Sequence, residues 1–162
     1  MSHRNRTRVL FVCLANICRS PTAEAVFRQH VKQAGLADRI LVDSAGTAAY
    51  HTSEPPDSRA RRVALQRGYD LTGLRARQVD RTDFAEFDYI VVMDLENLRA
   101  LAPLCPQEHG HKVKLFADYC STGACTISDP YIGGPDDFAQ MLDRIEDGVN
   151  GLLQHIIREM ET

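Results

Sequence analysis

The sequence has no long apolar run and no excess of basic residues. None of its apolar stretches approaches the roughly 20 residues needed to span a bilayer. The start, MSHRNRTR, is basic, but the apolar stretch from Val9 to Ile17 is too short and too polar for a signal peptide. Lys and Arg number 19 against 22 Asp and Glu, which gives a formal net charge of -3. We therefore expect no membrane partner and no nucleic-acid partner, because a phosphate-backbone binder needs a basic excess.

Disulfide staples are not expected either. The chain has five cysteines, an odd number, and at 162 residues it is large enough to build its own core. With no signal peptide, we expect reduced thiols and a cytoplasmic protein, although export without an N-terminal signal is left open. The 44% hydrophobic and 25% charged residues are those of an ordinary globular protein. We expect a flexible basic N-terminus over residues 1–7 and a single domain over residues 8–162.

Strand and helix patterns alternate along the chain. Apolar, β-rich runs predict strands over residues 8–12, 39–46, 87–94 and 112–119. Helical periodicity, caps and stops predict helices over residues 21–34, within 53–68, over 95–103 and over 138–160. Such alternation predicts an α/β fold: a single-domain, parallel four-stranded sheet with helices on both faces. Cys120 to Pro135 is the least regular stretch and is predicted to be a long functional loop.

The segment FVCLANICRSPTAEAVF, residues 11–27, joins the first strand to the first helix. Such a loop lies at the carboxyl edge of a parallel sheet, where ligands bind. The helix that opens at Ser-Pro directs free N–H groups and a positive dipole end toward the loop. Arg19 adds a planar, permanent charge that fits two phosphate oxygens. The loop therefore suits an anion.

Cys13, at the start of this loop, is a candidate nucleophile. Thiols near helix N-termini and arginines can have pKa values of roughly 3.5–7.5, against about 8.5 when unperturbed. A thiolate that faces a bound phosphate is a phosphoryl-transfer nucleophile. The alternative is a small buried Cys13 and an ordinary solvated Arg19. The coincidence of strand, cysteine, arginine and helix start favours the functional interpretation.

The same segment resembles the active-site loop of the low-molecular-weight protein tyrosine phosphatases, with the pattern C-x4-C-R-[ST]-P. The resemblance continues, in family order, through DSAGTAAYH, EPPDSRA, RARQV, DFAEFDYIVVMDLENL and DPYIGGPDDF. Unrelated phosphatase folds share the C-x5-R core alone, but its combination with a late D-P-Y is specific. The resemblance implies a Rossmann-like phosphatase fold. It also implies hydrolysis of phosphotyrosine monoesters through a phosphocysteine intermediate, with no cofactor and no metal.

The resemblance also implies the role of each site residue. Cys13 would be the nucleophile, and Ser20 would donate a hydrogen bond to its sulfur. Asn16 would shape the loop with Ser44 as partner. Asp129 would be the general acid and then the base for water, since a phenol with a pKa of about 10 leaves poorly without a proton. Arg19 would bind the phosphoryl oxygens. The rest of its segment would bind them too: Leu14, Ala15, Asn16, Ile17, Cys18 and Ser20. Alone, Asp129-Pro130 could equally be a simple turn.

The chain departs from the family at several places. Ala15 stands where glycine is usual, which is harmless if its φ is negative. Leu74 replaces a frequent histidine, and Ile132 replaces a second tyrosine. Leu14, Ile17, Tyr50 and Tyr131 are expected to wall the substrate pocket, with His51 as surface packing.

Several alternatives stay open. Ile17 favours phosphotyrosine over the phosphoarginine of related enzymes that carry threonine there. An arsenate reductase would need relay cysteines after the third strand, where none occurs before Cys105. Two C-x4-C pairs, Cys13/Cys18 and Cys120/Cys125, could bind zinc, although their spacing is wide. Cys18 is a possible redox partner that protects Cys13 as a disulfide. The expected partner is a phosphotyrosine protein, with a tyrosine kinase as one candidate.

Overall fold

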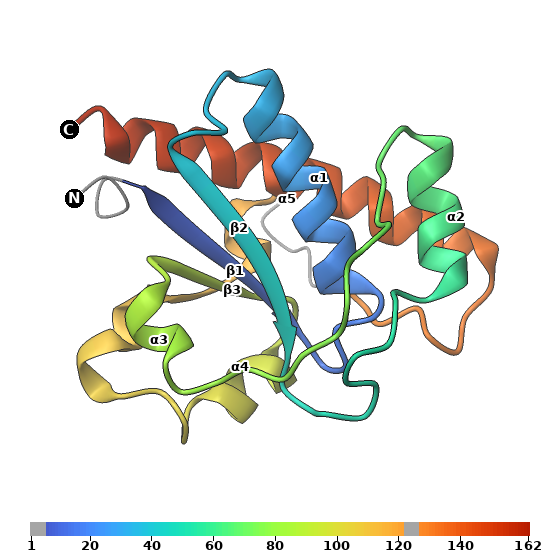
Figure 1. Ribbon diagram of the computed structural model, residues 1–162, viewed down its shortest axis with the longest axis horizontal. Helices are drawn as coiled ribbons and strands as arrows, with labels where there is room; N and C mark the ends of the chain where they lie inside the picture. The colour runs from blue at the N-terminus through green and yellow to red at the C-terminus, as the bar shows by residue number, and fades with distance from the viewer. Residues whose placement is uncertain (1–5, 122–126) are drawn as a thin grey trace.

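A four-stranded parallel sheet between two layers of helices forms the molecule (Figure 1). The computed structural model describes residues 6–121 and 127–162. The strands are β1 (Thr7–Cys13), β2 (Ile40–Gly46), β3 (Tyr89–Val92) and β4 (Val113–Leu115), in the spatial order β2-β1-β3-β4. The predicted fold class is therefore confirmed.

The two faces of the sheet carry separate cores, because successive side chains of a strand point to opposite sides. Val9 and Phe11 of β1 enter one core, and Leu10 and Val12 enter the other. The first core lies under α1 (Arg19–Gln33), α2 (Ser58–Gln66) and α5 (Pro135–Met160). The second lies under the short α3 (Asp83–Glu86) and α4 (Leu95–Leu101). Figure 1 shows these two groups of helices on opposite sides of the sheet.

The long helix α5 closes the first core. Its buried side chains recur at helical spacing, from Phe138 through Leu142, Ile145 and Val149 to Ile156. The sequence predicted this helix from Phe138, and the structure begins it at Pro135. Among the helices of the described residues, none is both long and apolar enough to cross a membrane.

The fourth strand is shorter than predicted. It ends at Leu115, and Phe116–Tyr119 form a 3-10 helix. Phe116 is fully buried, with its ring 6.1 Å from that of Phe11. Phe116 and the Tyr119 carbonyl lie directly against Gly148 and Gly151 of α5, where no Cβ keeps them away. Packing against α5 therefore takes this segment out of the sheet.

Other boundaries also differ from the expectation. β1 begins at Thr7, inside the segment expected to be flexible, and α1 begins at Arg19, two residues early. The helix α3 and a 3-10 helix over Gln107–Lys112 were not predicted. Residues 1–5 of the expected flexible N-terminus lie outside the described residues.

The strand register brings distant loops to one edge. Cys13 pairs with Gly46, and Val12 pairs with Val92. The strands β1, β2 and β3 thus end side by side, and the loops that follow them meet beyond their carboxyl ends.

Candidate active site

The Cys13 loop (residues 13–19) lies tightly against the end of β2. The Thr47 N–H donates to the Cys13 carbonyl at 2.9 Å, and the Ala48 N–H donates to the Leu14 carbonyl at 2.9 Å. A Cβ at Gly46 would lie 2.8 Å from the Leu14 oxygen. Position 46 therefore has to be glycine for the two backbones to approach so closely.

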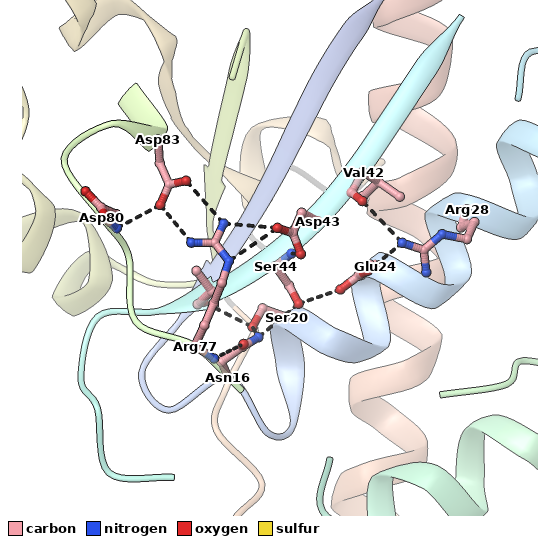
Figure 2. A network of polar contacts seen from close by, with 11 residues as sticks. Asn16, Ser20, Glu24, Arg28, Val42, Asp43, Ser44, Arg77, Asp80 and Asp83 are labelled. Atoms are coloured by element: carbon pink, nitrogen blue, oxygen red, sulfur yellow. Dashed lines mark hydrogen bonds and ion pairs between the residues drawn. The ribbon is translucent and has the colours of Figure 1, made fainter. Parts of the chain in front are cut away.

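Asn16 gives the loop its curvature. Its φ is 61°, in the left-handed region that asparagine tolerates better than most residues. The side-chain amide Nδ2 donates to Ser20 Oγ at 2.8 Å and to Ser44 Oγ at 2.9 Å (Figure 2). Oδ1 accepts from the Arg77 N–H at 3.0 Å. The contact expected between Asn16 and Ser44 is present, and the left-handed residue of the loop is Asn16, not Ala15.

The polar network continues from Ser44 to the buried Glu24 and the half-exposed Arg28 of α1. Ser44 Oγ donates to Glu24 Oε1 at 2.6 Å, and Arg28 Nη2 donates to Oε2 at 2.5 Å (Figure 2). Glu24 is 4% exposed, and this burial raises its pKa despite both hydrogen bonds. Sequence reasoning missed this residue, since nothing in the spacing of Glu24 links it to a serine 20 positions later.

Arg77 supports the loop from the other side. Its guanidinium binds Asp43 Oδ2 at 3.1 Å and Asp83 Oδ2 at 3.0 Å (Figure 2). These ion pairs fix the backbone of Arg77, whose N–H holds the Asn16 amide. Arg77 lies in the R-A-R-Q segment, which resembles the family, but the sequence did not predict this role for it.

The Cys13 sulfur lies 3.0 Å from Ser20 Oγ, and both residues are buried. Because Asn16 donates to the Ser20 oxygen, the single hydroxyl hydrogen of Ser20 remains for another acceptor. Its nearest alternative acceptor is the Ala45 carbonyl at 3.4 Å. The shorter contact favours donation from Ser20 to the sulfur of Cys13.

Arg19 is 2% exposed and is surrounded by acceptors. Its Nη1 donates to Asp94 Oδ2 at 2.6 Å and to the Ile127 carbonyl at 2.9 Å. Burial opposes the charge, but the neighbouring acidic groups outweigh this effect and raise the pKa of Arg19. The guanidinium therefore stays a fixed cation beside Cys13.

Asp94 was missed by the sequence analysis. It follows β3 and is also the N-cap of α4, where Oδ1 accepts from the Asn97 N–H at 2.8 Å. A polar residue directly after a buried strand, next to β1 in the sheet, was the available signal. One carboxylate thus caps a helix and orients Arg19.

Asp129 lies on the other side of the same cation, with Oδ2 3.7 Å from Arg19 Nη2. The Tyr131 N–H donates to Asp129 Oδ1 at 3.0 Å and so orients the carboxyl group. Asp129 is partly exposed, whereas Arg19 and Cys13 are not. The carboxyl therefore stands at the entrance of the site rather than at its floor.

Cys13, Arg19 and Asp129 line one cavity of about 200 Å³. All four side chains expected to wall the pocket are in it, and so is His51, which was expected to be plain surface packing. The His51 ring lies 6.2 Å from that of Tyr131, and Nδ1 lies 3.1 Å from Glu54 Oε2. The lining consists of Cys13, Leu14, Ala15, Ile17, Cys18, Arg19, Tyr50, His51, Asp129 and Tyr131.

Cys18 is the N-cap of α1 and is buried beside Cys13. Burial, together with the negative charge of Asp57, raises the pKa of Cys18 well above its usual value. The two cysteines thus have different chemistry: Cys13 faces Ser20, and Cys18 is held as a protonated thiol.

The structure also shows where the two other residues that differ from the family pattern lie. Leu74 packs against the first core, and Ile132 is almost fully exposed. Within residues 6–121 and 127–162, no group of three or more His, Cys, Asp or Glu side chains is placed to hold a metal ion. Cys125, on which the zinc alternative depends, lies outside those residues.

Comparisons with known proteins agree on one family. A family model described as low molecular weight phosphotyrosine protein phosphatase matches residues 8–162. A low molecular weight phosphotyrosine protein phosphatase of Schizosaccharomyces pombe is 45% identical over 92% of this chain and 96% of that protein. A low molecular weight protein-tyrosine-phosphatase of Streptomyces coelicolor is 42% identical over 95% and 96%. The crystal structure of a protein tyrosine phosphatase from Entamoeba histolytica superposes with a TM-score of 0.91 at 39% identity, over 94% and 98% of the two chains.

Proposed function

The chain belongs to the low molecular weight phosphotyrosine protein phosphatase family, and on that premise we propose that Cys13, Arg19 and Asp129 are its catalytic residues. The protein is a protein-tyrosine phosphatase, a hydrolase of phosphate monoesters. The observation that carries the assignment is that a buried thiol, a buried guanidinium and a partly exposed carboxyl line one small cavity.

In the first step the Cys13 thiolate attacks phosphorus. The S–P bond forms, and the bond between phosphorus and the tyrosyl oxygen breaks. Asp129 gives its proton to that oxygen, so the tyrosine leaves as a neutral phenol. Arg19 and the N–H groups of the Cys13 loop hold the phosphoryl oxygens, where the start of α1 adds a positive dipole end.

In the second step a water molecule attacks the phosphocysteine. Asp129, now a carboxylate, takes a proton from the water, and the S–P bond breaks with its electron pair on sulfur. The hydrogen bond from Ser20 stabilises the thiolate as it leaves. Inorganic phosphate is released, and the starting state returns.

The substrate is a protein-bound phosphotyrosine. Tyr50 and Tyr131 are exposed at the mouth of the cavity and can flank the phenyl ring, at about 0.5–1.5 kcal/mol per favourable ring pair. Ile17 gives the wall an apolar side chain, which suits a phenyl ring better than a guanidinium. A tyrosine kinase that carries phosphotyrosine is one candidate substrate.

The test compares phosphotyrosine peptide hydrolysis, phosphoarginine hydrolysis and thiol-dependent arsenate reduction. We expect phosphotyrosine turnover that is abolished in Cys13→Ser and reduced about 10²–10⁴-fold in Asp129→Ala, the range of a lost general acid. Cys105→Ser is the matched thiol control and should keep full activity, because Cys105 packs against the second core and does not line the cavity. Turnover of phosphoarginine alone would refute the substrate assignment, and arsenate reduction without phosphatase activity would refute the mechanism.

A further inference from the structure

Arg59, in the first turn of α2, reaches across to the segment that carries Asp129. Its Nη2 donates to the Tyr131 carbonyl at 2.7 Å, and its Nη1 donates to the Gly133 carbonyl at 3.4 Å. These carbonyls belong to the Asp129 loop (residues 127–134), which leads into α5. The guanidinium therefore binds this loop on the C-terminal side of Asp129.

Asp57 holds Arg59 in place. Its Oδ1 accepts from Arg59 Nε at 3.0 Å, and its Oδ2 accepts from Nη2 at 2.9 Å, a bidentate pair. Although burial works against ionisation of Asp57, the hydrogen bonds and charge of Arg59 lower its pKa. Four donor contacts thus fix the guanidinium between a carboxylate and two carbonyls.

The same aspartate touches the Cys13 loop. Its backbone N–H donates to the Ile17 carbonyl at 2.8 Å, and its side chain caps α2. A continuous path of contacts therefore runs from Ile17 through Asp57 and Arg59 to Tyr131. It joins the loop of the nucleophile to the loop of the acid.

Aromatic rings confine Arg59 further. Its Cζ lies 4.7 Å from the centroid of the Phe138 ring and 5.5 Å from that of Tyr131. Phe138 is fully buried in the first turn of α5. Stacking on an anchored ring and a bidentate pair together leave the guanidinium little freedom.

We propose that Arg59 is a positioning residue that sets the place of Asp129 in the cavity it shares with Cys13, an inference that rests on the proposed acid role of Asp129. Tyr131 transmits the effect, since its N–H orients the Asp129 carboxyl while its carbonyl is held by Arg59. An arginine that serves substrate docking would need free donors, and four of the five N–H donors of Arg59 are directed at the protein itself.

Kinetics with two leaving groups test this role. Phenyl phosphate needs protonation of its leaving group much more than 4-nitrophenyl phosphate does, because nitrophenol is the stronger acid. For Arg59→Met we expect kcat/KM to fall about tenfold or more with phenyl phosphate, since misplacement of a catalytic group by ~1 Å can cost about 10². With 4-nitrophenyl phosphate the fall should stay within about threefold.

Two further variants sharpen the test. Arg59→Lys keeps the charge but lacks the planar fork, so it should recover only part of the phenyl phosphate activity. Arg61→Met removes an exposed arginine two residues along α2 and should leave both rates unchanged. In an Asp129→Asn background, Arg59→Met should add little, because the acid that it positions is already lost.

The outcomes separate the two proposals. An equal loss with both substrates in Arg59→Met, or a full additional loss in the Asp129→Asn background, would overturn the positioning role while Asp129 stayed the acid. If Asp129→Asn lowered kcat/KM equally for phenyl phosphate and 4-nitrophenyl phosphate, the acid role of Asp129 and this inference would both be refuted. Should Arg59→Met fail to fold, the same comparison with Arg59→Lys decides between these outcomes.

Discussion

Ser20 Oγ and Cys13 Sγ lie 3.0 Å apart, and both residues are buried at the base of the cavity. The Asn16 amide donates to the same oxygen, which leaves the Ser20 hydrogen for an acceptor, and the contact with sulfur is shorter than that with the Ala45 carbonyl at 3.4 Å. A hydroxyl with a fixed direction stabilises negative charge on sulfur more than a freely rotating one would. Catalysis should therefore depend on a residue that never touches the phosphate through its side chain.

Replacement of Ser20 by alanine tests this dependence. A hydrogen bond to a charged group contributes about 1.5–3 kcal/mol, so we expect kcat to fall about 10- to 100-fold in Ser20→Ala. Breakdown of the phosphocysteine should slow most, because the leaving thiolate loses its donor. Rapid-quench measurement of phosphoenzyme formation and decay would resolve the two steps. Ser58→Ala, at an exposed serine of α2, is the control; an unchanged decay rate in Ser20→Ala would contradict the role.

Asp94 has two roles that two substitutions separate. Asparagine is a good N-cap, so Asp94→Asn should retain α4 while it removes the charge that orients Arg19. We expect kcat/KM to fall about tenfold, since a misplaced guanidinium binds the transition state less well. Asp94→Ala should lose, in addition, about 1 kcal/mol of unfolding free energy. Steady-state kinetics and urea unfolding measure the two effects. Equal losses of unfolding free energy in Asp94→Asn and Asp94→Ala would refute separate capping and orienting roles.

Glu24 should make stability depend on pH. Burial raises its pKa above the 4.5 of an unperturbed glutamate, so between these two values the folded protein binds more protons than the unfolded one. The free energy of unfolding contributed by this group therefore falls as pH rises through that window. In Glu24→Gln this fall is absent, so the variant should gain stability relative to the wild type from about pH 4.5 upward.

Urea unfolding at several pH values measures this difference. Glu86→Gln, at an exposed glutamate, is the control. A difference between Glu24→Gln and the wild type that is constant with pH, or that changes in the opposite direction, would show that Glu24 does not titrate in this way.

Cys18 is proposed as the redox partner of Cys13. After peroxide converts Cys13 to a sulfenic acid, the Cys18 thiol can lose its proton and attack the Cys13 sulfur; a disulfide forms, the S–O bond breaks, and the hydroxide takes up a proton and leaves as water. Because the pKa of Cys18 is raised, we expect this step to accelerate as pH increases. Mass mapping should find a Cys13–Cys18 disulfide in the wild type and a sulfinic acid on Cys13 in Cys18→Ser. A sulfinic acid with Cys18 unpaired in the wild type would exclude the role.

The sequence predicted the sheet and its helices because the apolar periods are regular where the elements are buried. β1, β3 and α5 are examples: the two strands send alternate apolar side chains into the two cores, and α5 buries its apolar side chains in the first core. The sequence predicted too long a β4, because contact with α5 determines where that strand ends. A local sequence pattern does not contain this contact. Propensity describes a segment, whereas packing against Gly148 and Gly151 depends on the assembled fold.

The candidate site divides in the same way. Cys13, Arg19 and Asp129 came from a local motif and a family resemblance, and the structure gathers them around one cavity. Glu24, Asp94 and Arg59 were missed as site residues because each acts through partners distant in the chain. Arg59 meets Gly133 across 74 positions, and Arg19 meets Asp94 across 75. Contacts between residues so far apart in the sequence form only when the parallel strands bring their loops to one edge of the sheet.

The Cys13 loop and the cavity mouth differ sharply in exposure. Cys13 and Arg19 are 2% exposed, whereas Tyr50 at the mouth is 73% exposed and Tyr131 is 45% exposed. Surface substitutions are usually nearly neutral for stability, and buried ones are not. Directed evolution of peptide preference can therefore draw its libraries from the mouth alone. A screen confined to the mouth residues would test new substrates while Cys13, Arg19 and the residues that support them stay unchanged.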